Sequence, residues 1–299
     1  MKYHGVVVPV VTPITADGKL DEPALHRLVD LLLAGGVDGI FVMGTTGEGT
    51  AVPRDCRLRL VRQTVARVNG RASVFAGIGD AHPEEIVAGN DYFRAGVDAV
   101  VSRPPTAIAP DKILPWYRTL LNGLEGPLLL YNMPMTTQVS IPIDTVEELI
   151  GHERLAGIKD SENDENRLEE LLRRFGGGKK FSIFVGVGAL MEKGLRLGAD
   201  GIVPSVGNLI PGVCQKLCAA ARDGNWSAAG DSYSRMSTVS KLYQKGRTLN
   251  ESLSVLKGAL HVLGLCAPHV LPPLKPLSES QLEKLRQEME RLHLLNGQA

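Results

Sequence analysis

Short apolar runs recur along the chain at intervals that suit buried parallel strands. Each run carries few charges, as expected of a strand that is covered on both faces. The runs lie at Gly5–Val10, Gly39–Val42, Ser73–Ala76, Asp98–Val101, Leu128–Tyr131, Ala156–Lys159, Phe181–Val185 and Gly201–Val203. Stretches with helical spacing separate them, such as the one containing Leu25, Leu28, Val29 and Leu32, which Asp21 is placed to cap.

A five-residue phrase occurs three times, each time directly before or at the start of one of these runs. Its copies begin at Gly36, Gly96 and Gly198 and precede the second, fourth and eighth strands. The glycine can end a helix in the left-handed conformation, and the apolar pair that follows starts a strand. Parallel strands need such helical crossovers. Eight such strands in succession predict an α/β fold and favour a closed (β/α)8 TIM barrel over a doubly wound open sheet.

The last part of the chain has helical spacing and no strand pattern. We predict that residues 1–224 form the barrel, which carries the active site, and that residues 225–299 form a C-terminal helical extension. Two sets of apolar residues at helical spacing support this division: Leu253, Leu256, Leu260 and Leu263, then Leu282, Leu285, Met289 and Leu292. The proline-rich segment Pro268–Pro276 links the last two helices.

Composition excludes several classes of protein. Hydrophobic residues make up 43% and charged residues 22%, which is typical of a globular chain and not of a disordered or fibrous one. The 33 basic residues balance the 33 acidic ones, so the basic excess of a nucleic-acid-binding protein is missing. No apolar run approaches the ~18–20 residues of a membrane span. Four cysteines without a C-x-x-C pair favour a reducing cytoplasm.

The candidate chemistry lies where the predicted strands end, because active sites of such barrels form at the carboxyl ends of the strands. Lys159 is the most informative residue there, since lysine rarely ends a buried apolar strand unless it is paired or functional. Burial favours the neutral amine, which can attack a carbonyl carbon and form a Schiff base. The alternative is a salt bridge to Asp160, Glu162 or Asp164. We interpret the acidic stretch 160–170 as the solvated start of a helix.

Other residues at the strand ends each allow two interpretations. Tyr131 is a candidate proton shuttle or an aromatic cap on the barrel. Thr45 and Thr46, with nearby backbone N–H groups, suit a carboxylate, or they belong to an ordinary glycine-rich turn. We interpret Glu48 as an internal hydrogen-bonding partner and not as a general base.

We expect no metal and no cofactor. The seven histidines form neither an H-E-x-x-H motif nor a cluster with carboxylates at metal-ligand spacing. Gly186-Val187-Gly188 follows a strand but lacks the third glycine of a dinucleotide fingerprint.

Four motifs together resemble the dihydrodipicolinate synthase / N-acetylneuraminate lyase family of class I, Schiff-base-forming aldolases. They are Pro9-Val10-Val11-Thr12-Pro13, Gly44-Thr45-Thr46-Gly47-Glu48, Tyr131-Asn132-Met133-Pro134 and Gly157-Ile158-Lys159-Asp160. The resemblance covers essentially the whole chain. It implies the barrel-plus-helices fold and a homo-oligomer, usually a homotetramer, with a dimer as the other possibility.

The resemblance also implies a role for each matching residue. Lys159 would form the Schiff base with the keto carbon of pyruvate or another 2-oxo acid, and Thr46 would hold the carboxylate of that acid. Tyr131, oriented by Thr45, would move protons while a carbon–carbon bond is made or broken. Two further residues, Gly186 and Val203, would line the pyruvate pocket. A protonated imine is itself an electron sink, so this chemistry needs no metal.

Two positions depart from the synthase branch. Thr136 stands where that branch has an arginine that holds a second carboxylate, and Pro105 stands where it has a tyrosine that completes a proton relay across a subunit contact. We therefore favour a lyase acting on a 2-oxo-3-deoxy sugar acid. Arg103 is a candidate for binding a distal anionic group, or else forms a surface salt bridge.

Two alternatives to the lyase remain. One is 4-hydroxy-tetrahydrodipicolinate (dihydrodipicolinate) synthase, which joins pyruvate and aspartate semialdehyde, with Arg103 replacing the missing arginine. The other is a non-catalytic 2-oxo acid sensor.

Overall fold

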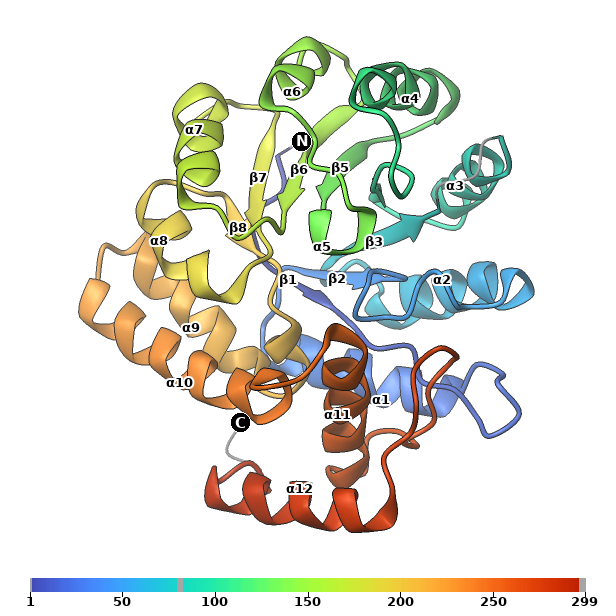
Figure 1. The fold of residues 1–299 in the computed structure, drawn as a ribbon, viewed down its shortest axis with the longest axis vertical. Helices are drawn as coiled ribbons and strands as arrows, with labels where there is room; N and C mark the ends of the chain where they lie inside the picture. Colours follow the sequence, from blue (N-terminus) through green and yellow to red (C-terminus); the bar gives the residue numbers. More distant parts are fainter. Residues whose placement is uncertain (1, 80–82, 296–299) are drawn as a thin grey trace.

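The computed structural model describes residues 2–79 and 83–295, and its centre is a closed barrel of eight parallel strands. Each strand pairs with its neighbours in chain order, and β1 pairs with β8 to close the ring (Figure 1). The strands are β1 (Gly5–Pro9), β2 (Gly39–Val42), β3 (Ser73–Ile78), β4 (Ala99–Ser102), β5 (Leu128–Asn132), β6 (Leu155–Asp160), β7 (Ser182–Val185) and β8 (Gly201–Ile202). The predicted (β/α)8 barrel is confirmed.

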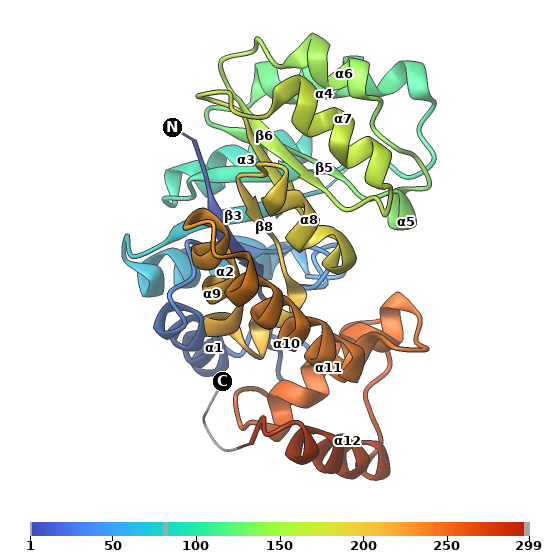
Figure 2. The same cartoon turned by 90° about the vertical axis from the view of Figure 1, so that its left-hand side faces the viewer.

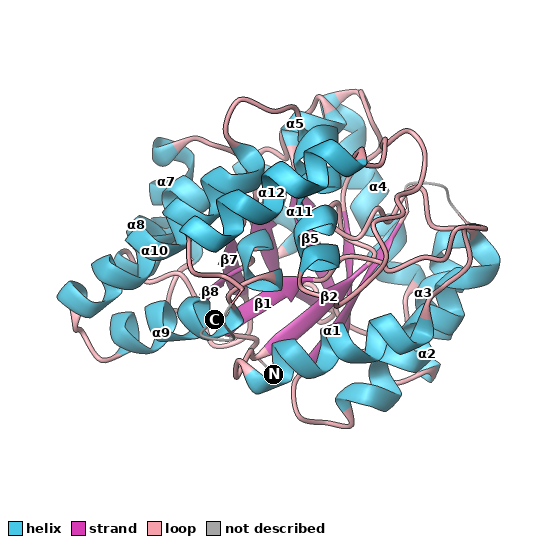
Figure 3. Ribbon diagram, turned by 90° about the horizontal axis from the view of Figure 1, so that it is seen from below, coloured by secondary structure: helices cyan, strands magenta, loops and turns pink. Residues whose placement is uncertain are grey.

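Helices surround the strands on the outside, as Figure 3 shows with the strands enclosed by helices. The barrel helices are α1 (Glu22–Ala34), α2 (Arg54–Val68), α3 (Glu84–Arg94), α4 (Pro110–Gly123), α6 (Ile143–Leu149), α7 (Glu165–Phe175), α8 (Met191–Arg196) and α9 (Pro211–Arg222). A short additional helix, α5 (Pro134–Thr137), follows β5. Asp21 caps α1 as predicted, because its side chain accepts a hydrogen bond from the N–H of Ala24.

Two apolar layers hold the barrel together. The inner layer fills the space within the ring and includes Val7, Phe41, Phe75 and Phe184. The outer layer lies between the strands and the helices, where α1 buries the four apolar residues that its sequence spacing predicts. This packing leaves the two ends of the barrel as the places where polar side chains can gather.

The repeated phrase builds the amino end of the barrel. Its glycines adopt positive φ angles of 74°, 98° and 94°, as the helix-ending interpretation requires. Its aspartates each accept a backbone N–H from the preceding strand in the ring: Asp38 from Val6 at 2.8 Å, Asp98 from Val74 at 2.7 Å and Asp200 from Ile183 at 2.9 Å. The phrase therefore recurs because three neighbouring strand pairs use the same hydrogen bond.

In the described chain up to residue 295, three helices follow the barrel: α10 (Trp226–Gln244), α11 (Leu249–Val262) and α12 (Glu279–Arg291). Helix α10 packs along α8 and α9, and α12 packs on α11 (Figure 2). Arg27 of α1 donates a hydrogen bond to the carbonyl of Leu265, just beyond α11. The helices of the last part of the chain thus lie against one side of the barrel. In the described residues, no helix has the length and apolar character that crossing a bilayer requires.

Candidate active site

A cavity of about 380 Å3 opens at the carboxyl end of the barrel. Its walls come from the segments that follow β2, β3, β4 and β5, and from the beginning of α11. Four of the predicted site residues line it: Thr45, Arg103, Tyr131 and Thr136. The cavity lies at the end of the barrel where this fold places its chemistry.

Lys159 lies near the end of β6, inside the barrel, with only 6% of its surface exposed. Its ammonium group lies 3.9 Å from the centre of the Tyr131 ring and 5.2 Å from the centre of the Phe41 ring. The acids expected as alternative partners are engaged elsewhere: Asp160 and Glu162 bind the Arg167 side chain, and Asp164 accepts the backbone N–H of Arg167. Among the described residues no acid forms a salt bridge with Lys159, and its ammonium group lies against aromatic faces.

Tyr131 lies near the end of β5, directly beside Lys159 in the sheet register. Its hydroxyl is 3.1 Å from that of Thr45. Burial raises the pKa of Tyr131, but the positive charge of Lys159 and hydrogen bonds with neighbouring side chains outweigh burial and lower the pKa below its ordinary value. A phenol that releases its proton more readily than usual is suited to proton transfer.

The loop that carries Thr45 and Thr46 is closely packed. Thr12 donates a hydrogen bond of 2.6 Å to the carbonyl of Gly47. A Cβ atom at Gly49 would lie only 1.9 Å from the carbonyl oxygen of Met43, so no larger residue fits there. Thr46 is buried in this loop, which is thereby fixed against the ends of the barrel strands.

Gly186 and Val203 lie against Lys159. A Cβ atom at Gly186 would lie 3.1 Å from Cε of Lys159 and 2.0 Å from Oγ of Ser161. Val203 borders the same small interior space as Lys159. The structure thus brings these two predicted residues to the buried end of the site.

Arg103 and Thr136 lie at the outer part of the cavity. Nη1 of Arg103 donates a hydrogen bond of 3.0 Å to Oγ1 of Thr136. Within residues 2–79 and 83–295, no carboxylate forms a salt bridge with Arg103. Arg103 lines the cavity, and its described hydrogen-bond partner there is the neutral hydroxyl of Thr136.

Glu48 is an internal partner, as predicted. Its carboxylate binds Lys257 of α11 at 2.5 Å and the backbone N–H of Leu271 at 2.6 Å. No local sequence pattern pointed to Lys257 as the partner of Glu48, because 209 residues separate the two.

A buried polar network that sequence reasoning missed lies behind Tyr131 and Lys159. Asn132 donates a hydrogen bond of 3.0 Å to Asp160, and Arg167 donates one of 2.8 Å to the same carboxylate. Burial raises the pKa of Asp160 in spite of the opposing charge of Arg167. The interpretation of residues 160–170 as solvated is therefore wrong for Asp160, which ends β6. The sequence signal for this network is position: Asp160 directly follows Lys159, and Asn132 directly follows Tyr131.

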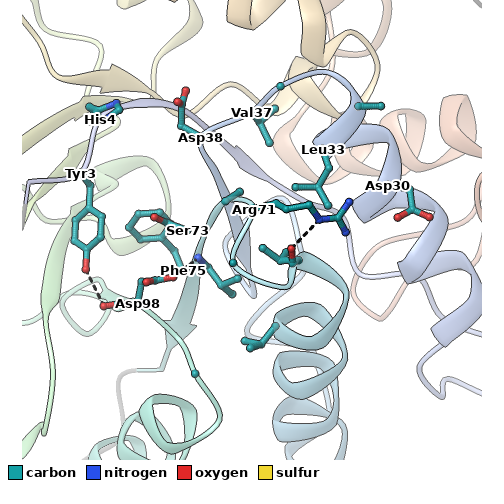
Figure 4. A pocket seen from close by; sticks show the side chains of 18 of the residues that line it. Tyr3, His4, Asp30, Leu33, Val37, Asp38, Arg71, Ser73, Phe75 and Asp98 are labelled. Carbon is teal, nitrogen blue, oxygen red and sulfur yellow. Dashed lines mark hydrogen bonds between the residues drawn. The ribbon is translucent and has the colours of Figure 1, made fainter.

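A larger cavity, of about 910 Å3, lies at the opposite, amino end of the barrel (Figure 4). Its polar side chains serve the fold: Tyr3 donates to the carbonyl of Asp98 at 2.8 Å, and Arg71 to that of Val68 at 3.1 Å. Across the described part of the chain, no group of three or more histidine, cysteine or acidic side chains is placed to hold a metal ion. The residues suited to chemistry gather around Lys159.

Known proteins resemble this chain over nearly its whole length. The 4-hydroxy-tetrahydrodipicolinate synthase of Thiobacillus denitrificans is 32% identical over 296 residues, which cover 98% of each chain. The dihydrodipicolinate synthase of Bacteroides thetaiotaomicron has a similar structure, with a TM-score of 0.91 and 30% identity over 97% of this chain and 98% of that one.

YagE of Escherichia coli, to which a 2-dehydro-3-deoxy-D-gluconate aldolase activity is provisionally assigned, is 28% identical over 98% of each chain. Its structure in complex with pyruvate matches with a TM-score of 0.90 over 98% of this chain and 99% of that one. The model of the dihydrodipicolinate synthetase family matches residues 2–292. With the barrel, the buried lysine and these relatives in agreement, the chain belongs to the dihydrodipicolinate synthetase family and is a class I aldolase-type lyase.

Proposed function

We propose that Lys159 forms a Schiff base with pyruvate or another 2-oxo acid and that the enzyme makes or breaks a carbon–carbon bond, acting on a 2-oxo-3-deoxy sugar acid. The observation that carries this proposal is the burial of the Lys159 ammonium on the Tyr131 ring, 3.9 Å from its centre, where no acid from residues 2–79 or 83–295 forms a salt bridge with it. The neutral form of this amine is a nucleophile that can attack a keto carbon.

The reaction begins when the neutral Nζ of Lys159 attacks the keto carbon; one proton is taken up from the solvent and water leaves, which produces a protonated imine. In the cleavage direction the phenolate of Tyr131 takes the proton of the substrate hydroxyl at the bond to be broken. The bond then breaks, an aldehyde leaves, and the electron pair moves into the imine to give an enamine. Tyr131 can return the proton to the enamine carbon, and water then releases pyruvate and restores Lys159.

The remaining site residues bind and orient. Thr46 and backbone N–H groups of its loop hold the substrate carboxylate, and Thr45 orients the Tyr131 hydroxyl at 3.1 Å. Gly186 and Val203 lie beside Lys159, where the small keto-acid end binds. Arg103 and Thr136 meet the distal part of the substrate in the outer cavity.

The synthase reaction is the second candidate, and one observation favours it. Arg103 reaches Thr136, so a guanidinium lies next to the position where the synthase branch has its arginine. Several relatives at 30–32% identity are named as synthases. Against it, Pro105 has no hydroxyl to complete a proton relay. A non-catalytic sensor would need neither Tyr131 nor its contact with Thr45.

We also propose that the chain acts in the cytoplasm as a homotetramer or dimer, without nucleic acid or membrane, and that residues 225–299 form an extension of the barrel 1–224. Light scattering during size-exclusion chromatography measures the assembly directly. A monomer at enzyme-assay concentrations would contradict the oligomer.

Borohydride trapping tests the Schiff base. With pyruvate, reduction should leave one adduct, which peptide mass mapping should place on Lys159, and Lys159→Ala should lose both trapping and turnover. Lys193→Ala is the matched control, because Lys193 pairs with Glu165 on the surface. Pyruvate release from a panel of 2-oxo-3-deoxy sugar acids then separates the lyase from the synthase and the sensor. An adduct on another lysine, or none with any 2-oxo acid, would contradict the proposal.

A further inference from the structure

A buried ion pair joins the threonine loop of the site to the helices that follow the barrel. Glu48 and Lys257 have side chains only 2% and 1% exposed, and their charged atoms lie 2.5 Å apart. The second carboxylate oxygen of Glu48 accepts the N–H of Leu271, at 2.6 Å. Both oxygens of the carboxylate are therefore bound by residues beyond the barrel, and neither is left for substrate.

Glu48 also fixes a turn that its own backbone disfavours. Its φ angle is +55°, in the left-handed region that residues with a Cβ atom rarely adopt. Its N–H donates to the carbonyl of Thr45 at 3.1 Å, and its carbonyl accepts from Ala51 at 2.8 Å. A side chain anchored at both oxygens can hold the backbone in such a conformation. Because Thr45 and Thr46 lie three and two residues before Glu48, the anchor sets where their hydroxyls and N–H groups lie.

Helix α11, which carries Lys257, also forms part of the cavity wall. Leu249 and Leu253 of α11 line the 380 Å3 cavity, as do Pro273 and Leu274 beyond it. Lys257 lies one helical turn after Leu253. Helix α11 therefore contacts the site in two ways. Its first turns border the cavity, and its Lys257 binds Glu48 in the loop that carries Thr45 and Thr46.

We propose that Lys257 and Glu48 are positioning residues, which hold the Thr45–Thr46 loop in the geometry that binds the 2-oxo acid carboxylate. This inference rests on the function proposed above. Removing one partner leaves the other charge buried and unpaired, so the loop must move to reach water or another partner. Since the chemistry occurs at Lys159 on β6, the loss should appear in substrate binding more than in the steps that follow.

Three variants test the pair: Lys257→Met, Glu48→Gln and the double variant. Each single change should raise the half-saturating pyruvate concentration for borohydride trapping by roughly tenfold, a common size for coupled neighbours. Labelling at saturating pyruvate should still reach one adduct per chain, and kcat should stay within about threefold. The double variant should bind no worse than either single one, because it leaves no charge buried alone.

Lys2→Met is the matched control. Lys2 binds Asp200 at 2.7 Å at the other end of the barrel, so its loss removes a lysine–carboxylate pair, here a partly exposed one, far from the loop. Urea unfolding of every variant separates a stability loss from a binding loss. If Lys257→Met does not fold, Glu48→Gln carries the test, since glutamine keeps the shape and can still accept the N–H of Leu271.

Unchanged half-saturation in a folded single variant, or effects that simply add in the double variant, would overturn the positioning role. So would an equal rise in Lys2→Met. A wild-type enzyme that traps no 2-oxo acid would instead overturn the proposed function, and this inference with it.

Discussion

The guanidinium of Arg103 donates a hydrogen bond to the hydroxyl of Thr136 across 3.0 Å, at the outer part of the site cavity. One neutral hydroxyl and one guanidinium thus replace the arginine that the synthase branch carries at position 136. This arrangement can meet a hydroxylated substrate chain with Thr136 and a distal negative charge with Arg103.

We expect a poor synthase. Hydrogen bonds to charged partners are worth roughly 1.5–3 kcal/mol each. With Thr136 in place of an arginine, productive binding of aspartate semialdehyde should be weaker by on the order of 10²-fold. A coupled synthase assay, run on the wild type, on Arg103→Ala and on the control Arg118→Ala, measures this. Arg118 pairs with Glu148 on the surface. Strong wild-type synthase activity that disappears only in Arg103→Ala would make Arg103 the replacement clamp.

Replacing Tyr131 by phenylalanine should separate binding from chemistry. The ring that lies on Lys159 remains, so pyruvate trapping should persist, whereas turnover should fall by about 10²–10⁴-fold because a positioned proton-transfer group is lost. Steady-state kinetics and trapping on the same preparation measure both quantities. Turnover equal to that of the wild type would show that Tyr131 serves packing alone.

Tyr131 should be the first tyrosine to ionise as the pH rises. Its pKa is lowered from the ordinary value of 10.0, chiefly by the charge of Lys159 acting against burial, while burial raises the pKa of the other five tyrosines. Ultraviolet absorbance of the phenolate should therefore show one tyrosine titrating below pH 10.0, and Tyr131→Phe should lack that step.

The effect on stability follows from the sign of the shift. A lowered acid pKa adds stability above the unfolded value, and that contribution is lost as the pH falls through the folded value. Between the folded pKa of Tyr131 and the ordinary value of 10.0, the unfolding free energy should therefore rise with pH. If the first phenolate titration step persists in Tyr131→Phe, that step belongs to another tyrosine.

Gly186→Ala should close the space beside the reactive lysine. The added methyl group would meet Oγ of Ser161 at 2.0 Å and Cε of Lys159 at 3.1 Å, so Lys159 or its neighbours must shift. We expect a loss of trapping rate of about 10²-fold, the scale of a 1 Å misplacement at a reacting group. Gly188→Ala is the control, since nothing lies within 4 Å of its added methyl. Equal trapping by both variants would contradict the close fit at Gly186.

The fold was predictable because each buried strand is a short apolar run and each repeat begins with a helix-ending glycine. The second strand, Gly39–Val42, begins and ends where predicted, but β6 runs from Leu155 to Asp160 and not from Ala156 to Lys159. Strand ends depend on pairing register with neighbours, here Asn132 opposite Asp160, which no local pattern encodes. Helix α5 was missed because four residues are too few for helical periodicity.

The parts of the site that lie at strand ends were predictable, because topology alone brings Lys159, Tyr131 and the threonine loop together. Contacts between distant segments were not. Lys257 belongs to a helix whose apolar spacing gives no reason to expect a buried charge, and only the packed fold shows that it meets Glu48. Asp160 looked like part of an acidic, solvated stretch, since its partner Arg167 lies in the following helix.

The pairing of β1 with β8 has a consequence for how the chain is made. Only two residue pairs, Gly5 with Gly201 and Val6 with Ile202, join the first strand to the last, beside the hydrogen bond from Gly5 to the carbonyl of Asp200. During synthesis β1 therefore emerges from the ribosome with one edge open and meets that partner only after seven other strands have been made. Ring closure is a late, long-range step in folding. Until residue 202 emerges, β1 and the newest strand present unpaired edges, the arrangement through which unfinished chains join one another.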